Sequence, residues 1–173
     1  EQQMYDGLKA DLIPPLEGGD IDAQSAVGLS NKLHQMANGA VYDENGNVTN
    51  MLMKGQYFTI KEIIKFSDRV AAPIFTYTIK DKRGTELTGT NTMFEDVTVE
   101  PAKDGDVYEV EFKQKMTLQG GEYLLSMSCT SFEEGQHTVY HRLYDVVNLT
   151  VISNKNGVGV FDLESEVKVS KKG

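Results

Sequence analysis

Apolar and polar residues alternate with a period of two along most of the chain from Ala40 onward. This period is typical of β-strands that bury one face and leave the other in water. In the run 73–81, for example, Phe75, Tyr77 and Ile79 share one parity, and the turn residues that follow include Gly84. The alternating runs lie at 40–42, 55–66, 73–81, 107–118, 123–130, 139–152 and 158–169.

About seven or eight short strands with turns between them, and no helix among them, predict an all-β antiparallel β-sandwich. An immunoglobulin-like or a jelly-roll-like arrangement fits this spacing. Residues 1–36 differ, because Pro14-Pro15 and Gly18-Gly19 interrupt them. We interpret 1–36 as a tail or linker with a possible short helix, and 37–173 as the sandwich domain.

Two residues within the strands deserve separate predictions. Glu62 falls on the apolar parity of its run, which predicts a bulge or an edge position there. Cys129 falls on the buried parity of its run, where a single thiol usually serves as inert packing.

The charge balance narrows the class of partner. The chain has 173 residues, and 17 Lys and Arg against 26 Asp and Glu give a formal charge of 17 − 26 = −9. Such a surface repels phosphate backbones, so we expect no nucleic-acid partner. No run approaches the ~20 apolar residues of a membrane-spanning helix. The single cysteine excludes an intramolecular disulfide.

A search for catalytic, metal and cofactor motifs is negative. The chain has no Gly-rich phosphate loop, no dinucleotide fingerprint and no Gly-x-Ser-x-Gly elbow. His137 and His141 have a zinc-like spacing that belongs on a helix rather than a strand. The loop from Asp43 resembles a calcium loop, but Lys54 stands where the closing Glu belongs. We therefore expect no enzyme, no metal site and no cofactor.

A series of ordered motifs is more specific. It comprises 73–81 (PIFTYTIKD), 89–92 (GTNT), 118–123 (LQGGEY) and 144–151 (YDVVNLTV). Over about residues 37–163 this series resembles the C-terminal domain of the Wzt-type ATP-binding subunits of polysaccharide ABC exporters. Ala72 and Thr76 depart from the usual Asn and Gly of the first motif.

The resemblance implies a fold, a ligand and partners. In that family the domain is an immunoglobulin-like sandwich, usually a homodimer with exchanged C-terminal strands, that recognises the exported polysaccharide. The implied partners are the ABC transporter subunits, on the cytoplasmic side and peripheral to the membrane. The ATPase domain would lie outside this chain, in agreement with the missing phosphate loop.

Sites for neutral glycans combine an aromatic platform with short polar groups. Trp is absent, so Tyr and His beside hydroxyl groups are the candidates. If their strands are neighbours in one sheet, their outward faces form one polar patch. On a straight strand His141 and Arg142 point to opposite faces, so at most one joins the patch unless a bulge intervenes. The candidate carbohydrate-binding residues are Thr76, Thr78, Ser126, Ser128, Tyr140, His141, Arg142 and Asn148.

Two alternatives remain. Thr and Ser are also common on the wet face of any sandwich, so the chain could instead be a structural or dimerisation domain without a sugar site. In that case residues 158–169 are a plausible strand to exchange between subunits. A glycan-modifying enzyme is a third class, but no motif favours it.

Overall fold

The computed structural model describes residues 36–173. Eight β-strands form there, and the described residues contain no helix. The strands are β1 (Met36–Tyr42), β2 (Met51–Met53), β3 (Tyr57–Lys65), β4 (Pro73–Asp81), β5 (Glu86–Asn91), β6 (Val107–Lys115), β7 (Gly121–Glu133) and β8 (Gln136–Ile152).

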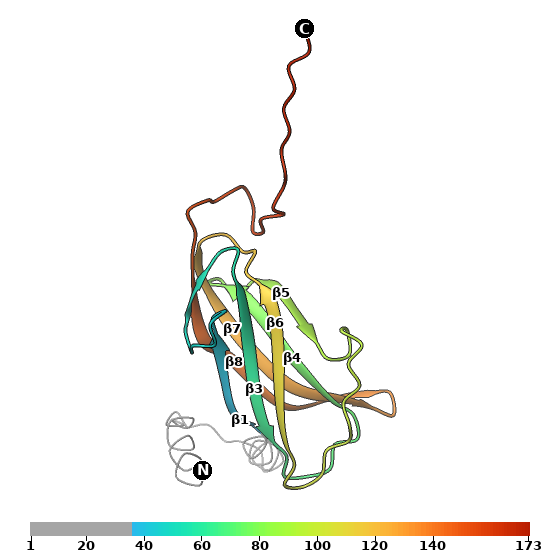
Figure 1. Cartoon of the computed structure of the whole chain (residues 1–173). Helices are drawn as coiled ribbons and strands as arrows, with labels where there is room; N and C mark the ends of the chain where they lie inside the picture. The colour runs from blue at the N-terminus through green and yellow to red at the C-terminus, as the bar shows by residue number, and fades with distance from the viewer. Residues whose placement is uncertain (1–35) are drawn as a thin grey trace.

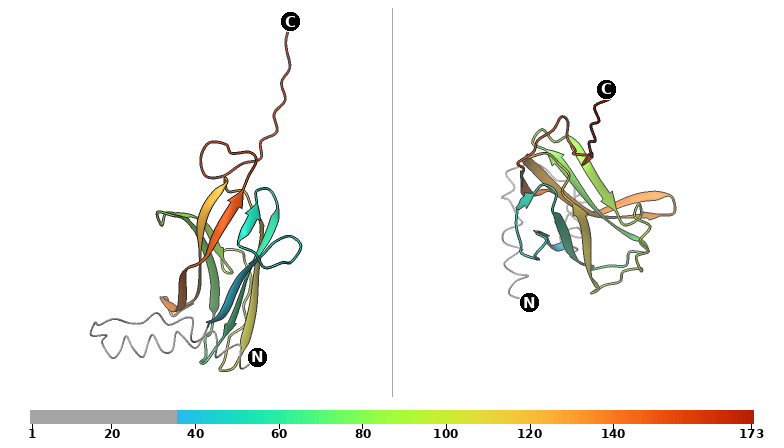
Figure 2. Two further views of the ribbon diagram at one scale, coloured as in Figure 1. Left: turned by 90° about the vertical axis from the view of Figure 1, so that its left-hand side faces the viewer. Right: turned by 45° about the horizontal axis from the view of Figure 1, so that its top comes forward.

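The strands form two packed sheets, as Figure 1 shows. One has three strands in the order β1-β3-β6, and the other has five in the order β2-β8-β7-β4-β5. Every neighbouring pair is antiparallel except β2 and β8, which are parallel. The predicted β-sandwich is therefore confirmed. The β7–β8 hairpin extends beyond the rest of its sheet (Figure 2).

Alternating side chains from both sheets fill the space between them. On β4 the buried residues are Phe75, Tyr77 and Ile79, in agreement with the sequence parity. Ring edges join the two layers, because the Tyr77 and Phe112 centroids lie 5.1 Å apart in a T-shaped contact. Burying each large side chain of this kind contributes about 1.5–3 kcal/mol, so this core can hold the sandwich without a disulfide.

The prediction of a bulge or an edge position at Glu62 is wrong. β3 is the central strand of its sheet, and Glu62 lies in regular register between Gly39 and Val110. Its side chain points into the core and is fully buried, and within residues 36–173 neither carboxylate oxygen has a hydrogen-bond partner. Burial raises the pKa of this carboxyl well above its usual range.

The first three residues of the GTNT motif form part of a β-strand. Residues 89–91 belong to β5, an edge strand that the sequence analysis did not anticipate. Gly89 pairs with Thr78 on β4, and a Cβ at this position would collide with the backbone oxygen of Tyr77. A glycine is therefore required for β5 to approach β4 closely.

The predicted last strand, 158–169, is not formed within the single chain. Phe161 makes one isolated antiparallel bridge with Leu118. Residues 162–173, which we term the C-terminal segment, then extend away from the sandwich (Figures 1 and 2). Its apolar residues Leu163, Val167 and Val169 are all more than 80% exposed. The predicted N-terminal helix lies outside the described residues.

Candidate functional site

Four hydroxyl side chains meet on the outer face of the five-stranded sheet. Thr76 lies opposite Ser128, and Thr78 lies opposite Ser126, on the adjacent strands β4 and β7. Their inward neighbours on these strands are buried, so the four hydroxyls share the outward face. We term Thr76, Thr78, Ser126 and Ser128 the hydroxyl shelf.

A cationic and aromatic group stands beside the shelf. Arg142 on β8 lies opposite Ser128 and faces outward. Its Nη1 donates a hydrogen bond of 3.2 Å to the hydroxyl of Tyr144, a residue that is 63% exposed. Two cations also lie over the Tyr144 ring: Lys80 Nζ is 5.1 Å and Arg142 Cζ is 5.8 Å from the ring centroid. These contacts hold the ring at the margin of the shelf.

A bulge in β8 sets the position of Tyr144. Leu125 pairs with Val147 and Met127 with Leu143, so three residues of β8 lie opposite Ser126 alone. Ser126 Oγ accepts a bond of 3.0 Å from the backbone N–H of Asp145 and donates to its Oδ1 at 3.2 Å. Asp145 has a φ of 53°, which a non-glycine residue adopts mainly at such irregularities.

The shelf continues into a groove between β4 and β5. A small hollow of about 120 Å³ lies over the shelf beside Arg142 and Tyr144. The adjoining groove has a volume of about 330 Å³ and shares Thr76 and Thr78 with that hollow. Phe94, which is 71% exposed, stands at its margin, and its backbone N–H donates to Asn91 Oδ1 at 2.7 Å. The missing side chain at Gly89 leaves room for this groove.

Of the eight residues proposed from the sequence, five lie together: the four shelf residues and Arg142. Asn148 is on the same outer face, opposite Leu124, but does not line either hollow. His141 lies opposite Cys129 and is buried, so it faces the core and does not join the patch. Tyr140 is half-buried and packs against the core.

The sequence analysis missed Lys80, Tyr144, Asp145 and Phe94. Lys80 and Tyr144 had a usable signal, because they continue the outward parity of Thr78 and Arg142 along β4 and β8. Asp145 had none, since its position depends on the bulge.

Two features of the described residues bear on metal and thiol chemistry. Residues 36–173 hold no cluster of three or more His, Cys, Asp or Glu able to ligate a metal ion. Burial raises the pKa of the Cys129 thiol well above its usual range, so this thiol is protonated and a poor nucleophile. No helix in this part of the chain could cross a membrane.

The described residues thus form a β-sandwich with a hydroxyl-lined outer face and aromatic rings at its margin. A family model described as the Wzt C-terminal domain matches residues 32–163, and the chain belongs to this family. This agrees with the resemblance drawn from the ordered motifs.

Solved structures support the fold. A structure titled as the C-terminal domain of wzt is similar with a TM-score of 0.73 and 22% identity, covering 78% of this chain and 83% of that one. The CARDB domain of PF1109 from Pyrococcus furiosus is 10% identical over 66% of this chain and 93% of that one, but its TM-score of 0.39 is too low to bear on the fold. No curated protein matches the chain.

Proposed function

We propose that this chain is the carbohydrate-binding domain of the ATP-binding subunit of a polysaccharide ABC exporter. It recognises the exported glycan at the cytoplasmic side of the transporter and leaves the glycan chemically unchanged. The observation that carries the proposal is the hydroxyl shelf with its cationic and aromatic margin. The family membership supports the transporter context.

The free hydrogen-bonding groups of the shelf suit a sugar. Among the described residues, no hydrogen bond occupies the side-chain hydroxyls of Thr76, Thr78 or Ser128, so all three remain available to a ligand. Hydroxyls both donate and accept, which matches the hydroxyls of a pyranose. Phe94 and Tyr144 offer exposed rings to its apolar faces.

A glycan array of bacterial surface polysaccharides tests this proposal. The full chain should bind at least one glycan saturably, and Thr78→Val, which keeps the shape but removes the hydroxyl, should weaken that binding about two- to tenfold. Thr138→Val is the matched control, because Thr138 is an exposed residue of β8 outside the shelf. Equal binding by all three proteins would refute the shelf as the site.

A second proposal concerns the homodimer, and it rests on the unpaired edge of β6. Just beyond β6, Met116 bonds through its backbone to Gly55 and Gln56, on the side of β3. Thr117 and Gln119 face the opposite side, where the Asp162 N–H donates to Thr117 O at 2.8 Å and the Gln119 N–H to Val160 O at 3.0 Å. A strand paired with β6 in this way would continue along its free edge.

Continuing this register brings apolar residues together. The pairing of Phe161 with Leu118, extended antiparallel, places Val167 opposite Phe112 and Val169 opposite Val110. Phe112 and Val110 line a groove of about 650 Å³ beside β6. Burying the two valines there would contribute about 1.5–3 kcal/mol each.

The same register also matches charges. It places Glu164 opposite Lys115, and these two residues already form an ion pair. It further places Glu166 opposite Lys113 and Lys168 opposite Glu111, on the outward face. Opposite charges on facing residues of antiparallel strands are stabilising. Residues 160–164 make these contacts within their own chain, so we infer that the part of the C-terminal segment beyond Glu164 crosses to β6 of the other subunit and takes this register there, which gives a homodimer by strand exchange.

A disulfide trap tests the exchange and its register. Facing residues of an antiparallel pair lie within the Cα separation that a disulfide allows. The double variant Lys113→Cys and Glu166→Cys should therefore give a covalent dimer on mild oxidation. Lys113→Cys with Ser165→Cys is the control, because Ser165 is one position out of register. A covalent monomer would mean that the segment folds back on its own chain, and no cross-link would refute the register.

A further inference from the structure

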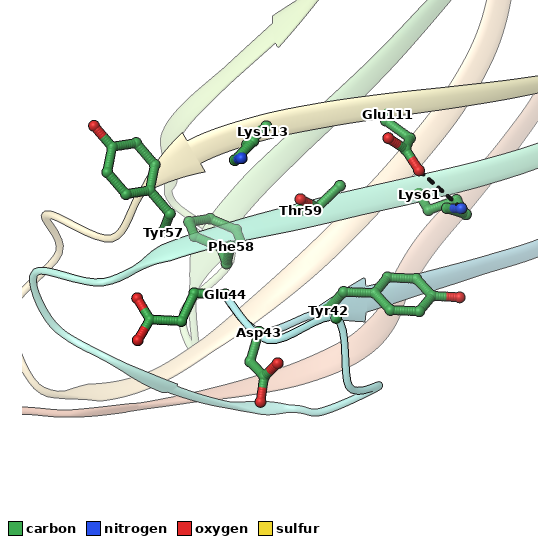
Figure 3. A pocket seen from close by; sticks show the side chains of 10 residues that line it. Tyr42, Asp43, Glu44, Tyr57, Phe58, Thr59, Lys61, Glu111 and Lys113 are labelled. Atoms are coloured by element: carbon green, nitrogen blue, oxygen red, sulfur yellow. Dashed lines mark ion pairs between the residues drawn. The ribbon is translucent and has the colours of Figure 1, made fainter.

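The outer face of the three-stranded sheet carries a second hollow, on the opposite side of the sandwich from the hydroxyl shelf. Its volume is about 520 Å³, within the range of ~300–1,000 Å³ typical of small-ligand sites. Figure 3 shows Thr59 near its middle, between Lys113 and Tyr42, with Tyr57 towards one end. We term it the tyrosine trough, lined by Tyr42, Tyr57, Thr59, Lys61, Glu111 and Lys113.

One end of the trough is held by ion pairs. Lys61 Nζ lies 2.8 Å from Glu111 Oε1 and 3.0 Å from Glu109 Oε1, and hydrogen bonds to these carboxylates raise the pKa of Lys61. The same ammonium lies 5.4 Å from the centroid of the Tyr42 ring. Lys61 therefore fixes both the Glu111 carboxylate and the Tyr42 ring before any ligand arrives.

The loop beside Tyr42 is equally well fixed. Asp43 Oδ1 accepts hydrogen bonds of 2.9 Å from the backbone N–H groups of Asn45 and Asn47, an arrangement that also lowers the pKa of Asp43. Glu44 at the rim accepts a bond of 2.9 Å from Gln56 Nε2. A wall built in this way loses little conformational entropy when a ligand binds.

The centre of the trough offers groups with no protein partner. Within residues 36–173, neither the Thr59 hydroxyl nor the Lys113 ammonium takes part in a side-chain hydrogen bond or ion pair. The Tyr57 side chain is 53% exposed beside them. Thr59 lies opposite Tyr42 on β1 and opposite Lys113 on β6, so the sheet register brings these groups into one row.

We propose that the tyrosine trough is a second saccharide-binding site. The Tyr57 ring stacks on the apolar face of a pyranose, and the Thr59 hydroxyl hydrogen-bonds to its hydroxyls. This inference rests on the proposed glycan-binding function. It adds that one sandwich holds two parts of the polysaccharide, on opposite faces, and two linked contacts raise the overall affinity above that of either alone.

The absence of Trp from the chain allows each site to be followed separately. Tyr57→Trp places a single fluorescent indole in the trough and Tyr144→Trp places one beside the shelf, and both keep an aromatic ring. The probes are short defined oligosaccharides that cannot reach both faces at once, released from the polysaccharides that bind on the glycan array. Tyr57→Trp should show a saturable change in emission, and adding Thr59→Val should raise its Kd about two- to tenfold. In the Tyr144→Trp protein, Thr59→Val should leave the Kd unchanged.

The outcomes separate the two sites. A response of both reporters, with Thr59→Val affecting only Tyr57→Trp, supports the trough. A response of Tyr144→Trp alone overturns the trough and leaves the shelf standing. A response of Tyr57→Trp alone overturns the shelf and makes the trough the single site. If neither reporter responds to any oligosaccharide, both the glycan-binding function and this inference are wrong.

Discussion

Lys54 Nζ lies 2.8 Å from Asp162 Oδ2, and this ion pair joins the turn between β2 and β3 to the point where the C-terminal segment leaves the sandwich. The Lys54 side chain is only 9% exposed. Its ammonium also donates to Gln119 Oε1 at 2.7 Å and to the Lys155 carbonyl at 2.6 Å. The buried Lys54 ammonium therefore holds residues 155–162 against the sandwich. In the C-terminal part of the chain, the residues after Asp162 lie beyond these contacts and can reach another subunit.

Lys54→Met should loosen these contacts while keeping most of the buried alkyl chain. Gln119, Lys155 and Asp162 each lose a charge-assisted hydrogen bond, so we expect Tm to fall by about 2–4 °C and residues 155–162 to become open to protease. Limited proteolysis with mass spectrometry measures the second effect. Lys82→Met is the control, because Lys82 is exposed in the turn after β4. Identical cleavage patterns in both variants would show that Lys54 does not hold the segment.

Glu62 predicts a pH dependence of stability. Its pKa in the folded chain is raised by burial, so the folded state favours the protonated form. The contribution of Glu62 to the free energy of unfolding should therefore be fully present below the ordinary pKa of 4.5 and be lost as the pH rises from there through the raised pKa. Glu62→Gln removes the titration and should raise stability at neutral pH by about 1–3 kcal/mol.

Urea unfolding of the wild type and Glu62→Gln between about pH 4 and pH 8 checks this slope. Glu86→Gln on β5 is the control, because Glu86 is exposed and its side chain makes no hydrogen bond or ion pair among the described residues. Parallel stability curves for the wild type and Glu62→Gln would contradict the buried, protonated carboxyl.

Glu62 also shows where sequence reasoning stops. The period-two alternation of apolar and polar residues in β3, β4, β6 and β7 was sufficient to predict the sandwich, because few other folds bury one face of every strand. Glu62 does not fit this alternation, because it is a charged residue at an apolar position. Only the pairing of β3 with β1 on one side and β6 on the other shows that β3 is the central strand. Long-range pairing of this kind is not encoded in local parity.

The candidate site, too, could be predicted from the sequence only in part. Parity placed the four shelf hydroxyls on the outward face, and their meeting required β4 and β7 to be neighbours, which the motifs alone did not establish. Parity also separated His141 from Arg142, and the structure shows that Arg142 is the outward one. Asp145 lies in the bulge that two extra residues make in β8, a feature for which the sequence carries no recognisable signal.

Gly89→Ala should displace β5. The added Cβ meets the backbone oxygen of Tyr77, which cannot move without breaking the pairing of β4 with β5. We expect a loss of about 1–3 kcal/mol in the free energy of unfolding, measured in urea. Gly121→Ala is the matched control, because a Cβ there would meet only the Tyr123 ring at ordinary contact distances of 3.6 Å or more. Equal stability of the two variants would mean that β5 does not need the glycine.

Substitutions of Ser126 and of Ser128 should have different effects on stability and on glycan binding, although both residues belong to the hydroxyl shelf and are similarly buried. Ser126 Oγ satisfies the Asp145 backbone within the β8 bulge, whereas the Ser128 hydroxyl has no hydrogen bond among the described residues. Ser126→Ala should therefore cost about 1–2 kcal/mol of stability and shift Tyr144, which weakens glycan binding indirectly.

Ser128→Ala should change stability by less than about 0.5 kcal/mol and raise only the Kd for a glycan identified on the array. Urea unfolding and fluorescence titration of the two variants in the Tyr144→Trp background measure both quantities together. If Ser126→Ala unfolds at the same urea concentration as Ser128→Ala, the bulge does not depend on Ser126. Tyr144 would then be positioned by Lys80 and Arg142 alone, the two cations that flank its ring.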